Sequence, residues 1–374
     1  MEIRRIVLAP DSFKGTMSAR EVCQVEKQAL LEVFPQAHIT CLPMADGGEG
    51  LTDTCLGLLG GERVAVRVTG PRHTPVEAFY ARLPDGSAVI EMAAAAGLPL
   101  MNGRLDPLTA TTQGVGELIL HAAHRGARRI LLGLGGSATN DGGVGMAYAL
   151  GWRFYDGAGC PVAPLAGNLS QIEDIRLEAP LPELEVLAAC DVDNPLCGET
   201  GATAVFGPQK GVTPQTRPIL EAGLAHLAAR MEAAGGSPLA GLPGAGAAGG
   251  LGAGVCFFLG GSLHPGVELV LEAAEFDALA AGADLVITGE GRMDGQSARG
   301  KVPSGVARRC AAAGVPCVAL CGGLGEGARV MYDLGVTAMF STLHGFTTPE
   351  AAAGTCRADL ADLTRAVARL LAAL

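Results

Sequence analysis

A glycine-rich loop that joins an apolar strand to a helix of small residues constrains the fold of this chain most strongly. Residues 130–132 are Ile-Leu-Leu, the loop spans residues 133–143, and Asn140 or Asp141 is suited to cap the helix that follows. Such a loop offers backbone N–H groups and the positive end of a helix dipole, which together bind phosphate. Strands that run into polar loops recur at residues 6–9, 285–288 and 318–320. We therefore expect an α/β protein whose loops converge on one anionic ligand.

The composition of the chain limits the classes of molecule that it is expected to bind. Its 374 residues carry a net charge of −11 without a Lys/Arg cluster, which argues against nucleic acid and anionic membranes. No apolar run reaches the roughly 18 residues of a membrane span, and the first residues do not resemble a signal peptide. The 11 cysteines are scattered without a C-x-x-C motif, as in proteins with reduced, buried thiols. We therefore expect a cytoplasmic protein, and leave open whether it is a monomer or a homodimer.

The order of the expected elements divides the chain into domains. Residues 1–62 alternate strand and helix, and Ser18 with Glu21 forms a capping box at the start of the first helix. Residues 63–92 alternate apolar and polar side chains, which predicts a small antiparallel sheet with one solvated face. From residue 283 the strand–loop–helix order returns and continues to a last helix over residues 358–371. We predict one discontinuous, mostly parallel α/β domain (1–62 plus 283–374) and an inserted α/β domain (63–282).

A dinucleotide-binding pattern supports one alternative function. Gly133-x-Gly135-x-x-Ala138 follows a strand, and Asp156 lies where a ribose-binding acid is expected. This arrangement is typical of an NAD(P)-dependent hydroxy-acid reductase. A second match at residues 244–249 has no apolar strand before it, so glycine packing explains it equally well.

A near match to the phosphate-binding P-loop lies at residues 295–301. It has the G-x-x-x-x-G-K spacing, but Val302 stands where a Ser or Thr hydroxyl should bind Mg²⁺. We reject a P-loop site and keep Lys301 as a candidate phosphate ligand. A hydrolase triad or zinc site is disfavoured, since no G-x-S-x-G motif occurs and His121 with His124 has no obvious third partner.

Acidic residues in the loops after the expected strands carry the most functional information. Each alone is typical of a helix cap or a turn. Together with lysines and an arginine in comparable loops, they indicate a site of mixed charge. Phosphoryl transfer needs that mixture, because carboxylates hold Mg²⁺ and orient the attacking hydroxyl while cations neutralise phosphate. The set is Asp11, Asp46, Glu49, Asp141, Asp191, Asp193, Glu290 and Asp294, with Lys14, Lys210 and Arg292.

Seven motifs in a fixed order resemble those of the bacterial glycerate kinases, in particular the group associated with 2-phosphoglycerate formation. They are APDSFKG (9–15), ADGGEG (45–50), GGSATNDGG (135–143), DVDNPL (191–196), FGPQKG (206–211), GAGAAGG (244–250) and TGEGRMD (288–294). The resemblance implies a Rossmann-like discontinuous domain, an inserted domain and a cleft between them. It also implies phosphorylation of D-glycerate by ATP with Mg²⁺, at the 2-hydroxyl. A glycerate 3-kinase, the reductase and a non-catalytic sugar-acid sensor are the alternatives.

We assign residue roles within this expected site as hypotheses. The catalytic residues are Asp191, which accepts or orients the hydroxyl proton, and two point charges, Lys14 and Lys210. The glycerate contacts are Asp11, Ser12, Asp46, Asn194 and Arg292. The nucleotide contacts are Gly135, Gly136, Ser137, Ala138, Thr139 and Asp141. The candidates for Mg²⁺ are Asp46, Glu290 and Asp294.

Overall fold

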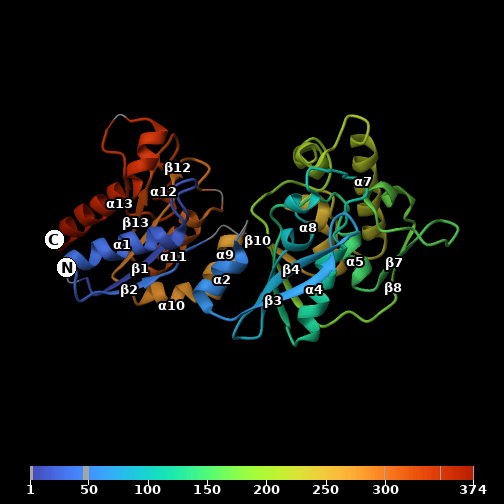
Figure 1. Cartoon of the computed structure of the whole chain (residues 1–374), viewed down its shortest axis with the longest axis horizontal. Helices are drawn as coiled ribbons and strands as arrows, with labels where there is room; N and C mark the ends of the chain where they lie inside the picture. Colours follow the sequence, from blue (N-terminus) through green and yellow to red (C-terminus); the bar gives the residue numbers. More distant parts are fainter. Residues whose placement is uncertain (1–2, 45–49, 299, 346, 374) are drawn as a thin grey trace. The chain divides into compact units, whose positions relative to one another are not determined.

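The computed structural model describes residues 3–44, 50–298, 300–345 and 347–373, so the predictions for Asp46 and Glu49 fall outside the described residues. The chain forms two compact units. Unit 1 comprises Met1–Asp46 and Val267–Leu374, and unit 2 comprises Gly47–Gly266. Each contains its own sheet, and Figure 1 shows the elements of both.

Unit 1 is built on five parallel strands in the order β15-β13-β11-β1-β2. The strands are β1 (Arg5–Pro10), β2 (His38–Cys41), β11 (Leu285–Gly289), β13 (Cys317–Cys321) and β15 (Ala338–Ser341). Figure 1 shows strands from the blue and the orange parts of the chain together in this sheet. Numbered along the unit, the order is 2-1-3-4-5, which reverses direction between β1 and β11. Doubly wound folds bind ligands at such a reversal, outside the carboxyl ends of the strands.

Helices cover the sheet of unit 1, as its buried strands require. They are α1 (Ala19–Val33), α9 (Gly266–Ala273), α10 (Phe276–Ala281), α11 (Val302–Ala313), α12 (Val330–Asp333) and α13 (Pro349–Ala372), with a small ribbon of β12 (Arg292–Met293) and β14 (Gly323–Leu324). The predicted capping box of Ser18 and Glu21 is confirmed at α1. The last helix begins at Pro349 instead of the predicted residue 358, because Thr348 caps it and Pro349 occupies its first position.

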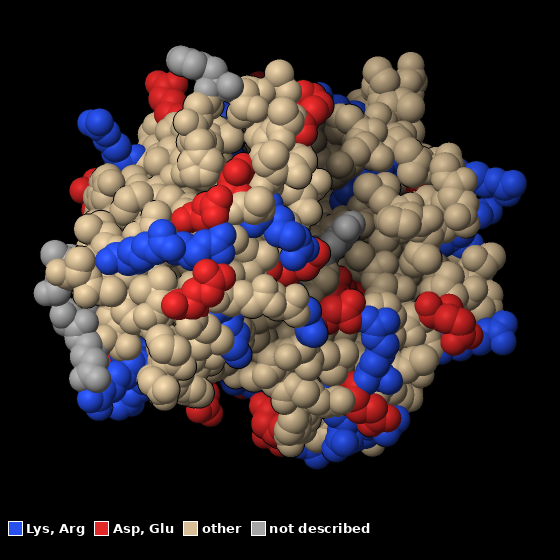
Figure 2. Space-filling view, turned by 60° about the vertical axis from the view of Figure 1, so that its left-hand side comes forward, with Lys and Arg blue, Asp and Glu red and all other residues tan. Residues whose placement is uncertain are grey.

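Helices α1 and α13 pack side by side, as Figure 1 shows. Arg365 of α13 pairs with Glu32 of α1 at 3.2 Å across this contact. On the face presented in Figure 2, Lys and Arg side chains likewise lie beside Asp and Glu side chains. No helix among the described residues is both long and apolar enough to span a membrane.

Glu26 of α1 is an exception in the apolar core of unit 1. Its side chain is fully buried, and neither carboxylate oxygen has a hydrogen-bond partner among the described residues. Burial raises the pKa of Glu26 well above its usual value, and the charge of Cys41 adds to the effect. A carboxyl group buried in this way costs stability, most of all when it is ionised.

We therefore expect Glu26→Met to raise the free energy of unfolding by about 1–3 kcal/mol near pH 8, since a flexible apolar chain replaces two unsatisfied oxygens. A raised folded-state pKa means that the wild type loses stability as the pH rises from the ordinary Glu value through the raised one. The gain should therefore be smaller near pH 4. Denaturant titrations at both pH values measure this difference. Glu32→Gln, on the exposed side of α1, is the control and should change stability by less than about 1 kcal/mol. A variant less stable than the wild type near pH 8 would contradict the argument.

Unit 2 contains a six-stranded mixed sheet in the order β10-β9-β6-β5-β4-β3. These strands are β3 (Glu62–Thr69), β4 (Pro75–Arg82), β5 (Ala88–Glu91), β6 (Arg129–Gly133), β9 (Glu185–Ala189) and β10 (Ser262–His264). The antiparallel pairing predicted over residues 63–92 is confirmed, but the expectation that these strands form a small sheet of their own is wrong. Strands β3 to β5 are antiparallel, but β5 continues in parallel with β6, where Val89 lies opposite Leu131.

The remaining elements of unit 2 surround this sheet. Its α-helices are α2 (Leu51–Leu59), α3 (Ala93–Ala96), α4 (Gln113–His124), α5 (Val144–Ala149), α6 (Ala202–Phe206), α7 (Arg217–Ala233) and α8 (Ala247–Phe258). Short 3₁₀ segments are η1 (Leu98–Met101), η2 (Ala166–Gln171) and η3 (Pro208–Lys210). A separate pair of antiparallel strands is β7 (Trp152–Tyr155) and β8 (Asp174–Leu177). The predicted α/β class with mostly parallel sheets is confirmed.

Along the chain, the division between the two compact units falls before α2 and after Gly266, the first residue of α9. The predicted domain boundaries follow α2 and α10. Glu91 at the end of β5 accepts hydrogen bonds from Gly50 N (3.1 Å) and Thr52 N (2.8 Å), which ties the start of α2 to the sheet of unit 2. Arg309 of α11 pairs with Glu268 of α9 at 2.7 Å and with Asp277 of α10 at 2.8 Å. Both helices are thereby held to unit 1.

Candidate active site

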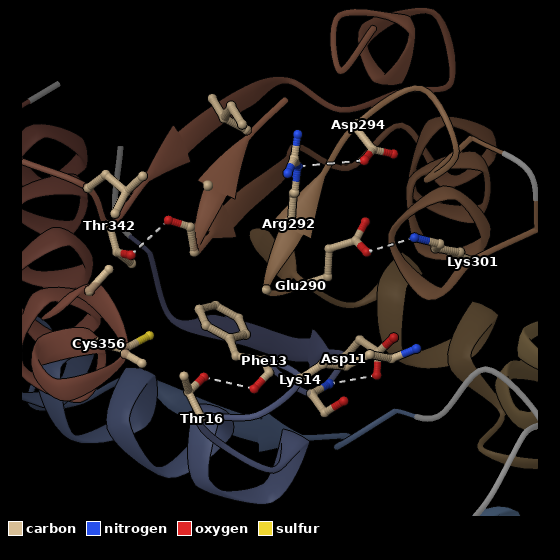
Figure 3. Close-up of a pocket in the computed structure, with 18 residues that line it drawn as sticks. Asp11, Phe13, Lys14, Thr16, Glu290, Arg292, Asp294, Lys301, Thr342 and Cys356 are labelled. Atoms are coloured by element: carbon tan, nitrogen blue, oxygen red, sulfur yellow. Dashed lines mark hydrogen bonds and ion pairs between the residues drawn. The ribbon is translucent and has the colours of Figure 1, made fainter. Parts of the chain in front are cut away.

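A cavity of about 570 Å³ opens in unit 1 at the carboxyl ends of β1, β11, β13 and β15. It includes the point between β1 and β11 where the strand order reverses, the expected ligand position in a doubly wound sheet. Figure 3 shows side chains from the loops after β1, β11 and β15, from Lys301 just before α11, and from α13 around it. Its charged and hydroxyl-bearing lining includes Asp11, Ser12, Lys14, Thr16, Glu290, Arg292, Asp294, Lys301 and Thr342.

Glycine allows the loops around this cavity to pass close to one another. A Cβ atom on Gly289 would lie 1.8 Å from the carbonyl oxygen of Leu320, and one on Gly322 would lie 2.3 Å from that of Gly291. Backbone hydrogen bonds then join the loops, from Asp11 N to Gly289 O (2.8 Å) and from Gly322 N to Glu290 O (3.1 Å). The glycines of the TGEGRMD motif therefore hold the charged side chains of separate loops around one cavity.

Glu290 is the most unusual charged residue in the cavity. Its Oε2 lies 3.4 Å from Lys301 Nζ, yet the residue is only 6% exposed. Among the residues that the structure describes, none donates a hydrogen bond of normal geometry to its Oε1. Burial raises the pKa of Glu290, and the neighbouring Ser297 and Lys301 oppose this rise. A nearly buried carboxylate oxygen without a partner is suited to accept a ligand donor or to coordinate a cation.

The other charged side chains give the cavity both positive and negative charge. Arg292 Nε lies 3.8 Å from Asp294 Oδ2, and Asp294 Oδ1 accepts a hydrogen bond from Gln296 N at 2.9 Å. Lys14 is exposed, and it makes no ion pair with any residue of the described part of the chain. Within the described residues, no group of three or more His, Cys, Asp or Glu side chains is placed to hold a metal ion. Six of the predicted site residues thus come together here, namely Asp11, Ser12, Lys14, Glu290, Arg292 and Asp294.

Lys210 lies in unit 2 and reaches the predicted nucleotide-binding loop. It is 2% exposed, and its Nζ donates to Ser137 Oγ (2.7 Å) and to Thr139 O (2.8 Å). Burial lowers the pKa of Lys210 to about 7, although the negative charge of Asp141 acts to raise it. The ammonium group is enclosed by the loop that it supports, and the predicted contact of Lys210 with a substrate stays a prediction.

Asp141 is likewise an internal support of that loop. It has no exposed surface, and it accepts hydrogen bonds from Thr112 N (2.9 Å), Thr112 Oγ1 (2.9 Å), Gly143 N (3.1 Å) and Gly145 N (3.3 Å). Burial raises the pKa of Asp141, and these hydrogen bonds oppose the rise. Ala138 is also buried, and its N–H already donates to Ala96 O at 2.9 Å. Asp141 and the Ala138 amide are thus hydrogen-bonded inside the loop, while Gly135 and Gly136 keep exposed surface. The nucleotide contacts of this loop stay predictions.

Asp191 and Asn194 lie in the loop that follows β9. Asp191 is exposed, and its Oδ1 accepts a hydrogen bond from Gly266 N at 2.8 Å. Asn194 Nδ2 donates to Thr200 O at 2.8 Å, so this side chain also shapes its own loop. The roles of both residues, and the meeting of residues from the two units in one cleft, stay predictions.

Asp156 lacks the position that a dinucleotide site requires. It follows β7, which pairs with β8 in a two-stranded sheet apart from the six-stranded one. Its Oδ1 accepts hydrogen bonds from Ala158 N and Cys160 N of its own turn. The reductase alternative therefore loses its ribose-binding acid. The glycines at 244–249 pack closely instead, since a Cβ on Gly249 would lie 2.0 Å from Thr139 O.

Several apolar residues of the cavity were missed by the sequence predictions. They are Leu324, Leu343, Ala352, Ala353 and Cys356. Aliphatic side chains are so common in the core that no sequence signal separates these from their neighbours.

The fold and cavity define an α/β protein of the doubly wound class with a small-molecule site of mixed charge. Residues 6–372 match the model described as the Glycerate kinase family, and the chain belongs to that family. The protein is therefore an enzyme of the kinase class.

The chain is 45% identical over 346 residues to "Glycerate kinase" of Bacillus subtilis (strain 168), covering 91% of each chain. It is 40% identical over 373 residues to "Glycerate 2-kinase" of Escherichia coli (strain K12), covering 98% of each.

A solved structure agrees with these sequence relatives. The model is similar to the crystal structure of a putative glycerate kinase 2 from Salmonella typhimurium LT2, with a TM-score of 0.87 and 41% sequence identity. The match covers 99% of both chains.

Proposed function

We propose that this enzyme transfers the γ-phosphoryl group of ATP to the 2-hydroxyl of D-glycerate, which gives 2-phosphoglycerate. The relative named glycerate 2-kinase supports the choice of hydroxyl. The observation that carries the chemistry is Glu290, a nearly buried carboxylate with one unpartnered oxygen, placed beside Lys301 in a cavity at the switch point of the sheet. The 11 cysteines are all free thiols, which supports a reducing, cytoplasmic location.

The cavity of unit 1 would hold the nucleotide phosphates. Lys14 and Lys301 supply point charges, and Arg292 offers a planar guanidinium group suited to phosphate. Phosphoryl transfer depends mainly on positioning and charge neutralisation, so cations around the phosphates are the main requirement. We propose this cavity in place of the predicted loop at residues 135–141, because Lys210 and Asp141 fill the interior of that loop.

Glu290 and Asp294 fit a magnesium site. Mg²⁺ prefers oxygen ligands and usually takes only one or two carboxylates, with substrate phosphates and water completing its shell. The unpartnered Oε1 of Glu290 would be one such ligand. Bound Mg²⁺ would neutralise charge on the transferring phosphates. Asp46 stays a candidate that lies outside the described residues.

The residues proposed to act on the phosphoryl acceptor, glycerate, are assigned from the sequence. Asp191 is proposed as the general base, since it is an exposed carboxylate after a parallel strand. Asp11, Ser12 and Asn194 are the proposed contacts of glycerate. Arg292, which the sequence predicts as a further glycerate contact, is proposed to bind phosphate instead. Lys210 is proposed to position the loop of Ser137 and Thr139 without touching substrate.

A coupled assay of ADP release tests the function. With ATP and Mg²⁺, we expect ADP to form only when D-glycerate is present. NMR of the product should show the phosphorus coupled to the methine proton at C2. Coupling to the C3 methylene protons would make the enzyme a glycerate 3-kinase. No glycerate-dependent ADP release would contradict the kinase proposal and favour a sensor, while oxidation of NAD(P)H with a keto acid would favour the reductase.

A further inference from the structure

The cavity of unit 1 has two ends of opposite character. Figure 3 shows Lys301 and Asp294 on one side, and Thr342 and Cys356 on the other. On α13, two lining residues near Cys356 in the sequence, Ala352 and Ala353, are uncharged. Two further lining residues, Leu324 and Leu343, are 44% and 45% exposed, which is high for leucine side chains that line a cavity. Exposed apolar surface inside a cavity is typical of a ligand-binding surface.

The strands at this end fix the two leucines. In the β12–β14 ribbon, Arg292 lies opposite Gly323 and Met293 lies opposite Leu324. Leu324 is therefore next in sequence to the residue that pairs with Arg292. A Cβ atom added to Gly323 would lie 3.7 Å from Leu343 Cδ1, which places the Leu343 side chain beside this glycine. The leucines therefore continue the cavity from its charged part.

The start of α13 closes the same end without offering an anion site. Ala352 and Ala353 line the cavity from the first turn of this helix. The amides nearby are already used, because Ala351 N donates to Thr348 Oγ1 (3.3 Å) and Ala352 N to Thr348 O (2.9 Å). A phosphate or carboxylate would therefore find these amides already occupied, whereas an apolar ring would find aliphatic side chains.

We infer that this end is the nucleobase subsite of the enzyme, with Leu324, Leu343, Ala352 and Ala353 in contact with the base. The inference rests on the proposed function, because it takes ATP as the ligand of the cavity. Of the two proposed substrates, only the nucleotide has a large planar group that gains from apolar contacts, since every carbon of glycerate carries oxygen. The phosphates then extend toward Lys14, Arg292 and Lys301 at the charged end.

Calorimetric titration separates the contribution of the base from that of the phosphates. The full chain with Mg²⁺ is titrated with ADP and, separately, with tripolyphosphate, which has no base. The test variant combines Leu324→Asn with Leu343→Asn, two changes at exposed positions that should not impair folding. We expect it to bind ADP at least about tenfold more weakly and tripolyphosphate within about twofold of the wild type, because only the apolar contacts are lost.

Leu370→Asn is the matched control, since Leu370 is 56% exposed on α13 and does not line the cavity. It should leave both affinities unchanged. Unchanged ADP binding by the double variant, or an equal loss for ADP and tripolyphosphate, would overturn the nucleobase subsite while leaving the kinase function standing. A wild type that binds neither ligand would instead remove the proposed nucleotide cavity, and the subsite with it.

Discussion

Replacement of Glu290 by glutamine should lower kcat by about 100- to 1,000-fold, the range seen when a group that stabilises a charged transition state is removed. Glutamine keeps the size of the side chain but removes the charge that pairs with Lys301 and the oxygen proposed to bind Mg²⁺. Half-saturation should therefore require more Mg²⁺ in the variant. Initial rates across a Mg²⁺ series measure both effects.

The pH dependence gives a second test of Glu290. Burial raises its pKa, so the wild type should lose activity as the pH falls through a value above the ordinary range of glutamate. The Glu290→Gln variant should lack this decline. Glu326→Gln is the control, because Glu326 is exposed nearby and does not line the cavity. A Glu290→Gln enzyme with a kcat within about tenfold of the wild type would show that this carboxylate is not part of the reaction.

Asp141→Ala should give the largest loss of stability, about 3–5 kcal/mol, because each buried donor left without an acceptor costs about 1–3 kcal/mol. The change leaves Thr112, Gly143 and Gly145 without their shared acceptor, and it removes the negative charge that raises the pKa of the buried Lys210. Denaturant unfolding monitored by Trp152, which lies in unit 2, measures the effect.

Asp193→Ala is the control for this measurement. Asp193 is exposed, and its replacement should change the free energy of unfolding by less than about 0.5 kcal/mol. A loss below about 1 kcal/mol for Asp141→Ala would mean that the four hydrogen bonds contribute little, and that this residue is open to the ligand role predicted from the sequence.

Local sequence patterns were sufficient to predict many of the helices and strands. The strand at residues 285–288 and the helix at 51–59 were predicted to within one residue, because apolar runs and flanking glycines mark them. The pairing of β5 with β6 was not predicted, since it joins residues about 40 positions apart and depends on the crossover through α4. Sequence patterns describe neighbours along the chain, whereas sheet membership depends on distant partners.

In the candidate site, too, some features could be predicted from local sequence and others depend on distant contacts. Lys14, Glu290 and Arg292 were predicted to act together because charged residues after parallel strands meet at one edge of the sheet. The burial of Lys210 and Asp141 was not predictable, because it depends on contacts with Ser137 and Thr112, which lie far from them in the sequence.

The pairing of β1 with β11 has a consequence for how the chain folds during synthesis. Ile6 lies opposite Leu285 in the sheet, so β1 has no partner on that side until the roughly 280 residues that follow it have been made. The intervening unit 2 has its own core and is complete earlier. Such a long loop slows the final pairing and leaves a strand edge uncovered while translation proceeds. Nascent chains that stop before β11 are therefore the species most exposed to aggregation.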